Sequence, residues 1–412
     1  MRFLLYSYNF SPEKTGIGKY NGELADWLAK QGHSVDVITT NPYYPEWRVH
    51  GDYRSRQWRT ERHGNLTVYR CPMYIPSEMS GKKRLLSDLS FLLFSAFLWL
   101  RVFFKRRYDV VIGVCPSLFV GFYPALYKAI RGGIFVYHIQ DMQLDAAIQL
   151  GLIKNNLLIR LLRWAEGQFF RQATFVSSIS SGMKANILGK GLSQEKYLML
   201  ENWVDTDFIK PLSQAETVEL RKELGLSPTD RVILYSGNMG EKQGLEIIVE
   251  AAEKLTNHSD WKFVLCGDGA RKDHIVALAK GLSNVVFTNL IAYERLPELL
   301  SLAEVHLVPQ KRAAADLVLP SKMGGILAAG GLAIVAADKG TSLFDLIDSH
   351  DLGILIEPEN VQQLVNAIEL GLSQNNDALK VRTRQYARKY LNIDNVLKKF
   401  VENVSGTESG RF

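Results

Sequence analysis

Along nearly the whole chain, the spacing of hydrophobic and polar residues alternates between the pattern typical of strands and the pattern typical of helices. Short β-prone runs at Phe3–Tyr8 and Ser34–Thr40 flank Ile17–Lys30, where apolar residues recur at helical spacing. The first forty residues therefore predict a strand–helix–strand unit, whose two strands run parallel because a helix connects them. The same pattern predicts further strands at 109–114, 134–138, 174–177 and 197–200.

The pattern pauses near residues 201–207 and then restarts as a second series. A strand at 231–236 and a helix at 245–255 begin it, and further strands are predicted at 261–266, 285–288, 305–308, 332–336 and 353–356. Residues 376–405 predict terminal helices, and 406–412 a frayed tail. We therefore expect an α/β protein with two Rossmann-like doubly wound domains facing a central cleft. The predicted parts are residues 1–205, residues 206–390, and a helix and tail at 391–412 that cross back to the first domain.

A helix predicted at residues 85–104 is apolar on both faces. Its uncharged stretch between Asp88 and Arg101 has 12 residues, fewer than the roughly 20 that span a bilayer. Basic residues flank it: Lys82, Lys83, Arg84, Arg101, Lys105, Arg106 and Arg107. Two interpretations stay open: a helix lying in the interface of an anionic membrane, or a core helix of the first domain. Membrane pelleting of the pure protein that is lost in a folded Phe91→Glu variant would support the first interpretation.

Composition narrows the classes of protein. The 412 residues are 47% hydrophobic and 22% charged, which excludes a disordered or collagen-like chain. A net charge of +6 without a basic stripe argues against nucleic acid as a partner and favours anionic small molecules or lipid surfaces. The scattered Cys71, Cys115 and Cys266 form neither a disulfide framework nor a zinc site. The N-terminus lacks a secretory pattern, so we expect a cytoplasmic protein, peripheral at the inner face of the plasma membrane.

Candidate binding residues of the first domain follow its predicted strands. Gly16 and Gly18 lie between the first strand and its helix, where backbone amides attract anions. The alternative is a glycine turn without a ligand, and the missing third glycine weakens a dehydrogenase interpretation. His138 ends a buried strand, with Asp141 just after it, at the sheet edge where open α/β proteins bind ligands. A purely structural histidine is the alternative there.

Candidate anion-binding residues of the second domain lie in two loops. Gly237, Asn238 and Lys242 follow the first strand of this domain. Farther on, Ser321 and Lys322 begin a helix, so that backbone amides, a hydroxyl and an ammonium converge on one anion. Simple capping by Ser321 is the alternative. Asp205–Asp207 lies in the connector and is discounted as a metal site, so no metal is predicted.

Several motifs occur in a fixed order from one end of the chain to the other. They are Asn9–Pro12 with Thr15–Gly18, Leu24–His33, Glu201–Asp205, Gly237 with Gly244, Gly267–Gly269, and Leu319–Lys322 leading into Ala328–Gly330. In this order the chain resembles retaining glycosyltransferase family 4, which has the two-domain GT-B architecture. Within that family it is similar to bacterial exopolysaccharide enzymes of the colanic acid type.

The resemblance implies a hexosyltransferase that moves a sugar from a nucleotide-sugar to an acceptor, keeps the anomeric configuration and requires no cofactor or metal. His138, Asp141 and Lys322 would be its catalytic residues. The donor-binding residues would be Gly16, Gly18, Gly237, Asn238, Lys242, Gly267, Asp268, Ser321 and Lys322. A donor such as GDP-fucose, a polyprenyl-diphosphate-linked saccharide acceptor and an anionic membrane surface would be the partners.

The sequence departs from the family in two ways. Asn238 and Gln243 stand where the family usually has basic residues, and Lys242 is the substitute expected there. The family's paired glutamates fall on Leu317 and Gly325, which leaves Arg312 and Asp316 as replacement donor-binding candidates. Two alternative functions stay open: a non-catalytic nucleotide-sugar-binding or scaffold protein, which the missing glutamates favour, and a nucleotide-sugar epimerase built on the same two-domain plan.

Overall fold

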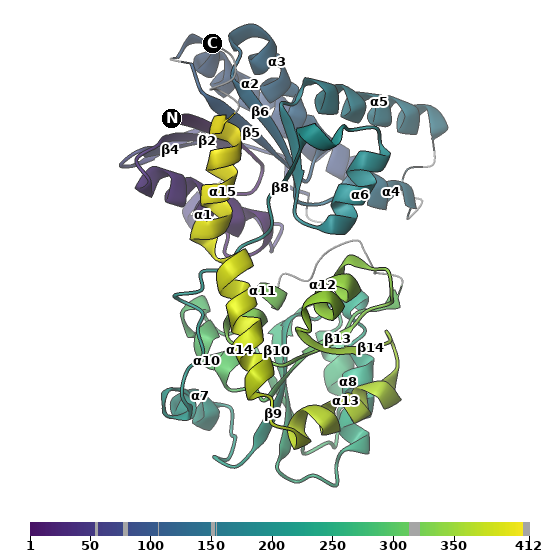
Figure 1. Ribbon diagram of the computed structural model, residues 1–412. Helices are drawn as coiled ribbons and strands as arrows, with labels where there is room; N and C mark the ends of the chain where they lie inside the picture. Colours follow the sequence, from purple (N-terminus) through teal and green to yellow (C-terminus); the bar gives the residue numbers. More distant parts are fainter. Residues whose placement is uncertain are drawn as a thin grey trace. The chain divides into compact units, whose positions relative to one another are not determined.

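The structure, a computed structural model, describes residues 1–53, 57–76, 81–105, 107–149, 153, 155–312 and 322–406. It divides into two compact units (Figure 1). One contains residues 1–201 together with the described part of 399–412, and the other contains residues 202–398. The predicted boundary at 205/206 therefore lies four residues after the observed one at 201/202.

The first unit contains an eight-stranded sheet in the order β3-β4-β2-β1-β5-β6-β7-β8. Its strands are β1 (Arg2–Tyr6), β2 (Ser34–Thr40), β3 (Arg59–His63), β4 (Leu66–Cys71), β5 (Val110–Cys115), β6 (Ile134–Ile139), β7 (Phe175–Ser178) and β8 (Tyr197–Met199). All neighbours pair in parallel except β3 and β4, which are antiparallel. Every residue of β5 and β6 is buried, as expected for central strands covered by helices on both faces.

The β3–β4 hairpin was not predicted from the sequence. Its outer strand reads RTERH, with no apolar residue and hence no alternating pattern. A polar edge strand of this kind discourages pairing with other chains. The same property hides it from an analysis that relies on hydrophobic periodicity.

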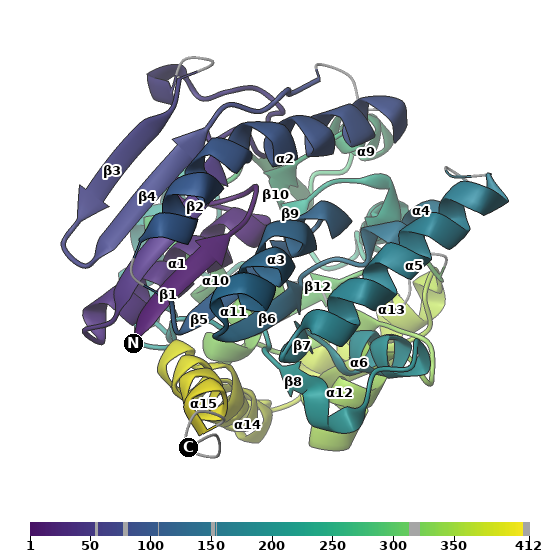
Figure 2. The same ribbon diagram turned by 90° about the horizontal axis from the view of Figure 1, so that it is seen from above.

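The helices of the first unit pack on both faces of its sheet. They are α1 (Gly16–Lys30), α2 (Gly81–Phe104), α3 (Phe122–Arg131), α4 (Gln143–Gln149), α5 (Asn156–Gln172) and α6 (Ser181–Gly189), and the end of α15 (Ile393–Gly406) also belongs to this unit. Helices α2, α3 and α5 lie next to one another along one face of the sheet (Figure 2). Right-handed crossovers place α1 on the opposite face.

Helix α2 has one buried and one exposed apolar side. Phe91, Leu98, Trp99 and Val102 are at most 5% exposed and belong to the core of the first unit. By length and composition, Lys83–Phe104 could cross a membrane, since its most apolar stretch has a mean hydropathy of 1.6. A third of the residues in that stretch are buried inside the protein. The core interpretation is therefore confirmed for one side of α2. A charge at Phe91 would disrupt this core and cannot serve as a membrane test.

The second unit contains a six-stranded parallel sheet in the order β11-β10-β9-β12-β13-β14. Its strands are β9 (Arg231–Asn238), β10 (Trp261–Asp268), β11 (Val285–Thr288), β12 (Val305–Val308), β13 (Ala333–Ala336) and β14 (Gly353–Ile356). Its helices are α7 (Val218–Glu223), α8 (Glu246–Lys254), α9 (Lys272–Leu278), α10 (Leu296–Ser301), α11 (Lys322–Ala328), α12 (Ser342–His350), α13 (Val361–Ser373) and α14 (Asp377–Tyr386), followed by a π-helical turn at Ala387–Leu391.

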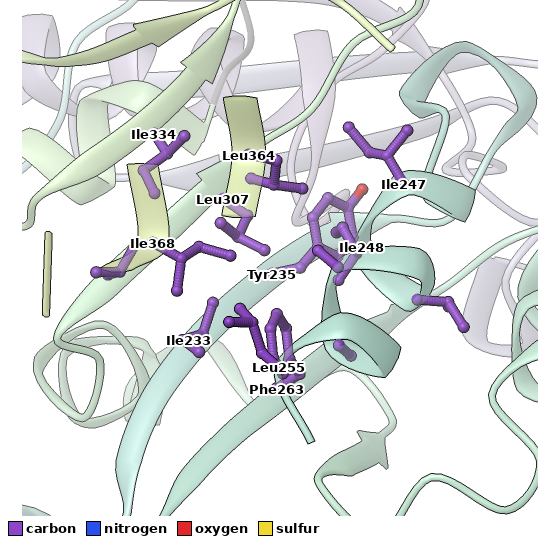
Figure 3. Close-up of a cluster of buried hydrophobic side chains, with 14 of the residues drawn as sticks. Ile233, Tyr235, Ile247, Ile248, Leu255, Phe263, Leu307, Ile334, Leu364 and Ile368 are labelled. Carbon is purple, nitrogen blue, oxygen red and sulfur yellow. The ribbon is translucent and has the colours of Figure 1, made fainter. Parts of the chain in front are cut away.

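Strand β9 contributes side chains to both hydrophobic clusters of this unit. Ile233 and Tyr235 point into one hydrophobic cluster (Figure 3), whereas Val232 and Leu234 point into the cluster on the other face. Successive side chains of a strand point to opposite faces, so one apolar run serves two layers of helices. This packing on both faces holds the carboxyl end of β9 in place, and the candidate site lies at that end.

Candidate active site

The carboxyl ends of β9 and β10 approach each other unusually closely. Gly237 is in register with Gly267, and Asn238 with Asp268. A Cβ atom added to Gly267 would lie 2.0 Å from the carbonyl oxygen of Gly237. Gly237 itself has a φ of 139°, a conformation that side chains rarely adopt. Both glycines are therefore required by the backbone at this edge of the sheet.

Lys322, the first residue of α11, reaches over the end of β9. Its Nζ atom lies 3.8 Å from the centre of the Tyr235 ring. A Cβ atom on Gly237 would lie 3.4 Å from both Cε and Nζ of Lys322, so the glycine leaves room for the ammonium. Tyr235 is held in turn by its hydroxyl, which donates to the carbonyl of Asn238 at 2.5 Å.

The ammonium of Lys322 has no hydrogen-bond partner among the residues that the structure describes. Part of the side chain reaches solvent, yet Nζ itself is buried. Burial lowers the pKa of Lys322 to about 7, because desolvation disfavours the charged form. A buried cation of this kind would be stabilised by an anion placed against it.

Other cations near this sheet edge are either paired with a carboxylate or exposed. Lys311 forms an ion pair with Glu241, and Arg271 contacts Glu246 at 2.6 Å. Arg312 lies 3.3 Å from Asp338, with 61% of its side chain exposed. Lys242 is exposed, and its backbone carbonyl accepts a hydrogen bond from the amide of Lys311 at 2.9 Å. Lys322 therefore differs from these cations, because its ammonium is buried and has no hydrogen-bond partner among the described residues.

For the remaining predicted residues of the second unit, contact with a donor stays a prediction. Asn238 and Asp268 are exposed, and the Asp268 carboxylate accepts from the amide of Gly269 at 2.8 Å. A Cβ atom on Gly325 would lie 3.3 Å from Leu300, which is buried in the core. Ser321 and Asp316 lie outside the described residues.

In the first unit, the glycine loop encloses a buried carboxylate. Glu13 is 2% exposed and accepts hydrogen bonds from the amides of Tyr43 and Tyr44 at 3.0 and 3.1 Å and from the side chain of Asn9 at 3.0 Å. A Cβ atom on Gly18 would lie 2.4 Å from Oε2 of Glu13. Gly18 is therefore required by Glu13, and a contact with a ligand remains a prediction. Gly16 has a φ of 59°, which also favours glycine.

Gly18→Ala is expected to destabilise the first unit by about 1–3 kcal/mol, because the new methyl group displaces the Glu13 carboxylate. Chemical denaturation followed by tryptophan fluorescence measures the change. Gly167→Ala is the matched control, since no atom lies within 4 Å of a Cβ there and alanine favours its helix. Equal stability of the two variants would contradict the role given to Glu13.

His138 is buried and fully hydrogen-bonded. Its Nδ1 lies 2.8 Å from Oγ of Ser177, and its Nε2 lies 2.9 Å from the side-chain nitrogen of Gln140. Burial lowers the pKa of His138 to about 3, so the ring is neutral. Asp141 is half-buried beside Gln143, whose amide lies 3.3 Å from Oδ2. These contacts match the structural alternative for His138, and its contact with a sugar remains a prediction.

Two residues that organise these loops were not identified from the sequence. Tyr235 places its ring under the Lys322 ammonium, and Glu13 ties the loop after β1 to residues 43–44. Both contacts join segments that are distant in sequence, and neither has a local pattern. Within the described ranges, no cluster of three or more His, Cys, Asp or Glu side chains could hold a metal ion.

Comparison with known proteins identifies the family of the chain. Residues 15–203 match the family described as "Glycosyl transferase 4-like domain", and residues 216–390 match "Glycosyl transferases group 1". The chain is 40% identical to a protein of Escherichia coli (strain K12) named as a colanic acid biosynthesis glycosyl transferase, WcaI. That alignment covers 98% of this chain and 100% of the relative.

Solved structures share the whole fold. Sucrose-phosphate synthase from Thermosynechococcus elongatus superposes with a TM-score of 0.72 at 17% identity, covering 100% of both chains. HepE from Anabaena, solved in complex with UDP, has a TM-score of 0.69 at 16% identity over 98% of this chain and 100% of its own. The chain therefore belongs to the glycosyltransferases and has the GT-B fold, with a glycosyl transferase 4-like domain followed by a group 1 domain.

Proposed function

We propose that this glycosyltransferase keeps the anomeric configuration of the sugar that it transfers from a nucleotide-sugar donor, with GDP-fucose as the specific candidate. The acceptor is a polyprenyl-diphosphate-linked saccharide of exopolysaccharide or lipopolysaccharide biosynthesis, reached from the cytoplasm at the inner membrane face. The name of the 40% identical relative supports the pathway, and the UDP complex of HepE supports a nucleotide-sugar as donor.

The observation that carries the proposal is the buried ammonium of Lys322 above Tyr235, which has no hydrogen-bond partner within the described part of the chain. Transfer breaks the bond between the sugar C1 and the β-phosphate oxygen and forms a bond from C1 to the acceptor oxygen. Negative charge then develops on the departing diphosphate, and a fixed, desolvated cation stabilises that charge without reorganising. The proton of the acceptor hydroxyl passes to the departing phosphate oxygen on the same face of the sugar, so no protein base is required.

The absence of the paired glutamates favours a second candidate, a protein that binds the nucleotide-sugar without turnover. Incubation with labelled UDP- and GDP-sugars and bacterial membrane lipid separates the candidates. Label in the lipid with retained configuration supports the proposal, and binding alone supports the second candidate. An altered free nucleotide-sugar indicates an epimerase. Loss of transfer on adding EDTA, restored by Mn²⁺, would refute a metal-independent reaction.

Binding of a nucleoside diphosphate is expected to take up close to one proton at pH 8 to 9. Free Lys322 has a pKa of about 7 and is largely neutral there, whereas a bound diphosphate raises that pKa and restores the charge. Affinity therefore falls as pH rises above 7. Calorimetric titrations in two buffers of different ionisation enthalpy measure the uptake, and no difference between the buffers would contradict it.

The matched control is Lys242→Ala, which removes an exposed lysine near the same sheet edge. It is expected to keep the proton uptake of the unaltered protein. A loss of uptake in this variant would assign the titrating group to Lys242.

A further inference from the structure

Exposed apolar side chains concentrate on the three adjacent helices of the first unit. Among the residues that the structure describes, fourteen of the 23 exposed large hydrophobic residues lie on α2, α3 and α5. These helices contact one another in the order α2, α3, α5 (Figure 2). Tyr123 of α3 stacks on Trp99 of α2 at 5.4 Å and joins the first two. Soluble monomers rarely expose large apolar patches, so this concentration of exposed apolar side chains on neighbouring helices marks an interaction site.

On each helix the exposed apolar residues follow helical spacing. The stripe of α2 includes Leu86, Leu89, Leu93, Phe97, Leu100 and Phe104, of which Leu93 is 71% and Phe104 is 88% exposed. On α3 the stripe consists of Phe122, Leu126 and Ile130, and on α5 of Leu157, Leu161 and Trp164. Side chains spaced by three or four residues share one face of a helix. Each helix therefore presents an apolar face outward besides the one that packs on the sheet.

The charges on these helices have one sign at the surface. Their two acidic residues, Asp88 and Glu166, are 9% exposed. Asp88 lies 3.6 Å from Arg84, and Glu166 lies 3.0 Å from Lys190. The basic residues among the described side chains are Lys83, Arg84, Arg101, Lys128, Arg131, Arg160, Arg163 and Arg171. The outward surface is thus apolar and cationic, with both carboxylates withdrawn from it.

Two tryptophans add to the same surface. Trp58 is 46% exposed and contacts Phe94 and Phe97 of α2 with ring centres 6.0 and 6.5 Å apart. Trp164 on α5 is 60% exposed. Tryptophan favours the boundary between headgroups and hydrocarbon, where its ring is buried and its N–H is hydrated.

We propose that α2, α3 and α5 together form a docking surface for an anionic lipid bilayer, with the helices lying in the plane of the interface. This inference rests on the proposed function, since it supplies the surface from which a lipid-linked acceptor enters. The proposed membrane surface includes α3 and α5 besides α2, the helix for which the sequence already indicates a membrane contact. A second copy of the chain is the competing occupant, and the basic surface disfavours it because two cationic faces repel.

Flotation of the full chain with vesicles tests the surface. Binding is expected with phosphatidylglycerol-containing vesicles, to weaken as salt is raised, and to be lost with pure phosphatidylcholine. Leu93→Glu with Phe97→Glu on α2 is expected to lower the partition coefficient roughly 100-fold. Leu161→Glu with Trp164→Glu on α5 is expected to lower it by a similar factor, and Arg160→Gln with Arg163→Gln roughly 20-fold.

The controls separate this surface from the donor site. Val381→Glu changes a residue of the second unit that is 55% exposed, and it should leave flotation unchanged. Lys322→Met should float normally, and the α2 and α5 variants should bind nucleotide as before. Flotation unaffected by the α5 variants would overturn the three-helix surface. A dimer in analytical ultracentrifugation that these variants dissociate, without vesicle binding, would overturn it in favour of a second copy.

Discussion

Lys322→Met is expected to lower kcat/KM roughly 100-fold to 1,000-fold, the loss typical of removing one preorganised donor from a developing anion. Methionine lacks only the terminal atom of the lysine side chain, so the change removes the ammonium over Tyr235 and keeps most of the packing of the side chain. Transfer assays and nucleotide titration measure the effect. Lys254→Ala, at an exposed position at the end of α8, is expected to change kcat/KM less than about threefold.

The Lys322→Met variant is also expected to be more stable than the unaltered protein in the absence of ligand. Folding lowers the pKa of Lys322 from 10.5 to about 7. Between these values the unfolded chain holds one more proton than the folded chain, so stability rises with pH across this window. Methionine removes the cost of the buried charge, and the gain is largest below pH 7. Lower stability at pH 6 together with full activity would refute the role of Lys322.

Gly267→Ala is expected to destabilise the second unit by at least about 3 kcal/mol and to abolish nucleotide binding. The added methyl group would lie 2.0 Å from the carbonyl oxygen of Gly237. That oxygen belongs to the backbone of β9, which both cores hold in place, so the contact cannot be relieved by a side-chain movement. Circular dichroism during thermal unfolding measures the loss.

Gly324→Ala is the control for this variant. A Cβ there would lie 3.7 Å from Val204, an ordinary contact, and alanine favours its position in α11. Equal melting temperatures for Gly267→Ala and Gly324→Ala would show that the two strand ends can separate without cost.

Hydrophobic periodicity predicted most of the fold because most strands consist largely of apolar residues, including the edge strands β11 (VVFT) and β14 (GILI). The strands predicted at 285–288, 305–308 and 353–356 coincide with β11, β12 and β14. The β3–β4 hairpin was missed because Arg59–His63 has no apolar residue. The sequence also showed apolar residues on both sides of α2, although it could not show which side the sheet would cover.

The site was less predictable than the fold. Loop position predicted Lys322 as an anion ligand, but only the structure shows that its ammonium is buried over Tyr235 with no partner among the residues described. Gly18 was interpreted as a residue that approaches a ligand, whereas the structure gives it a packing reason in Glu13. Such contacts join distant segments, and a single sequence contains no local signal for them.

The return of the chain to the first unit has a consequence for its synthesis. Phe400 and Val404 of α15 are at most 1% exposed, and the hydroxyl of Ser405 lies 3.3 Å from the sulfur of Met1. A ribosome adding about 5–20 residues per second needs roughly ten to forty seconds to make residues 202–398 before this segment emerges. During that interval the nascent amino-terminal domain lacks its last apolar layer, and chaperones that recognise exposed apolar surface have time to bind it.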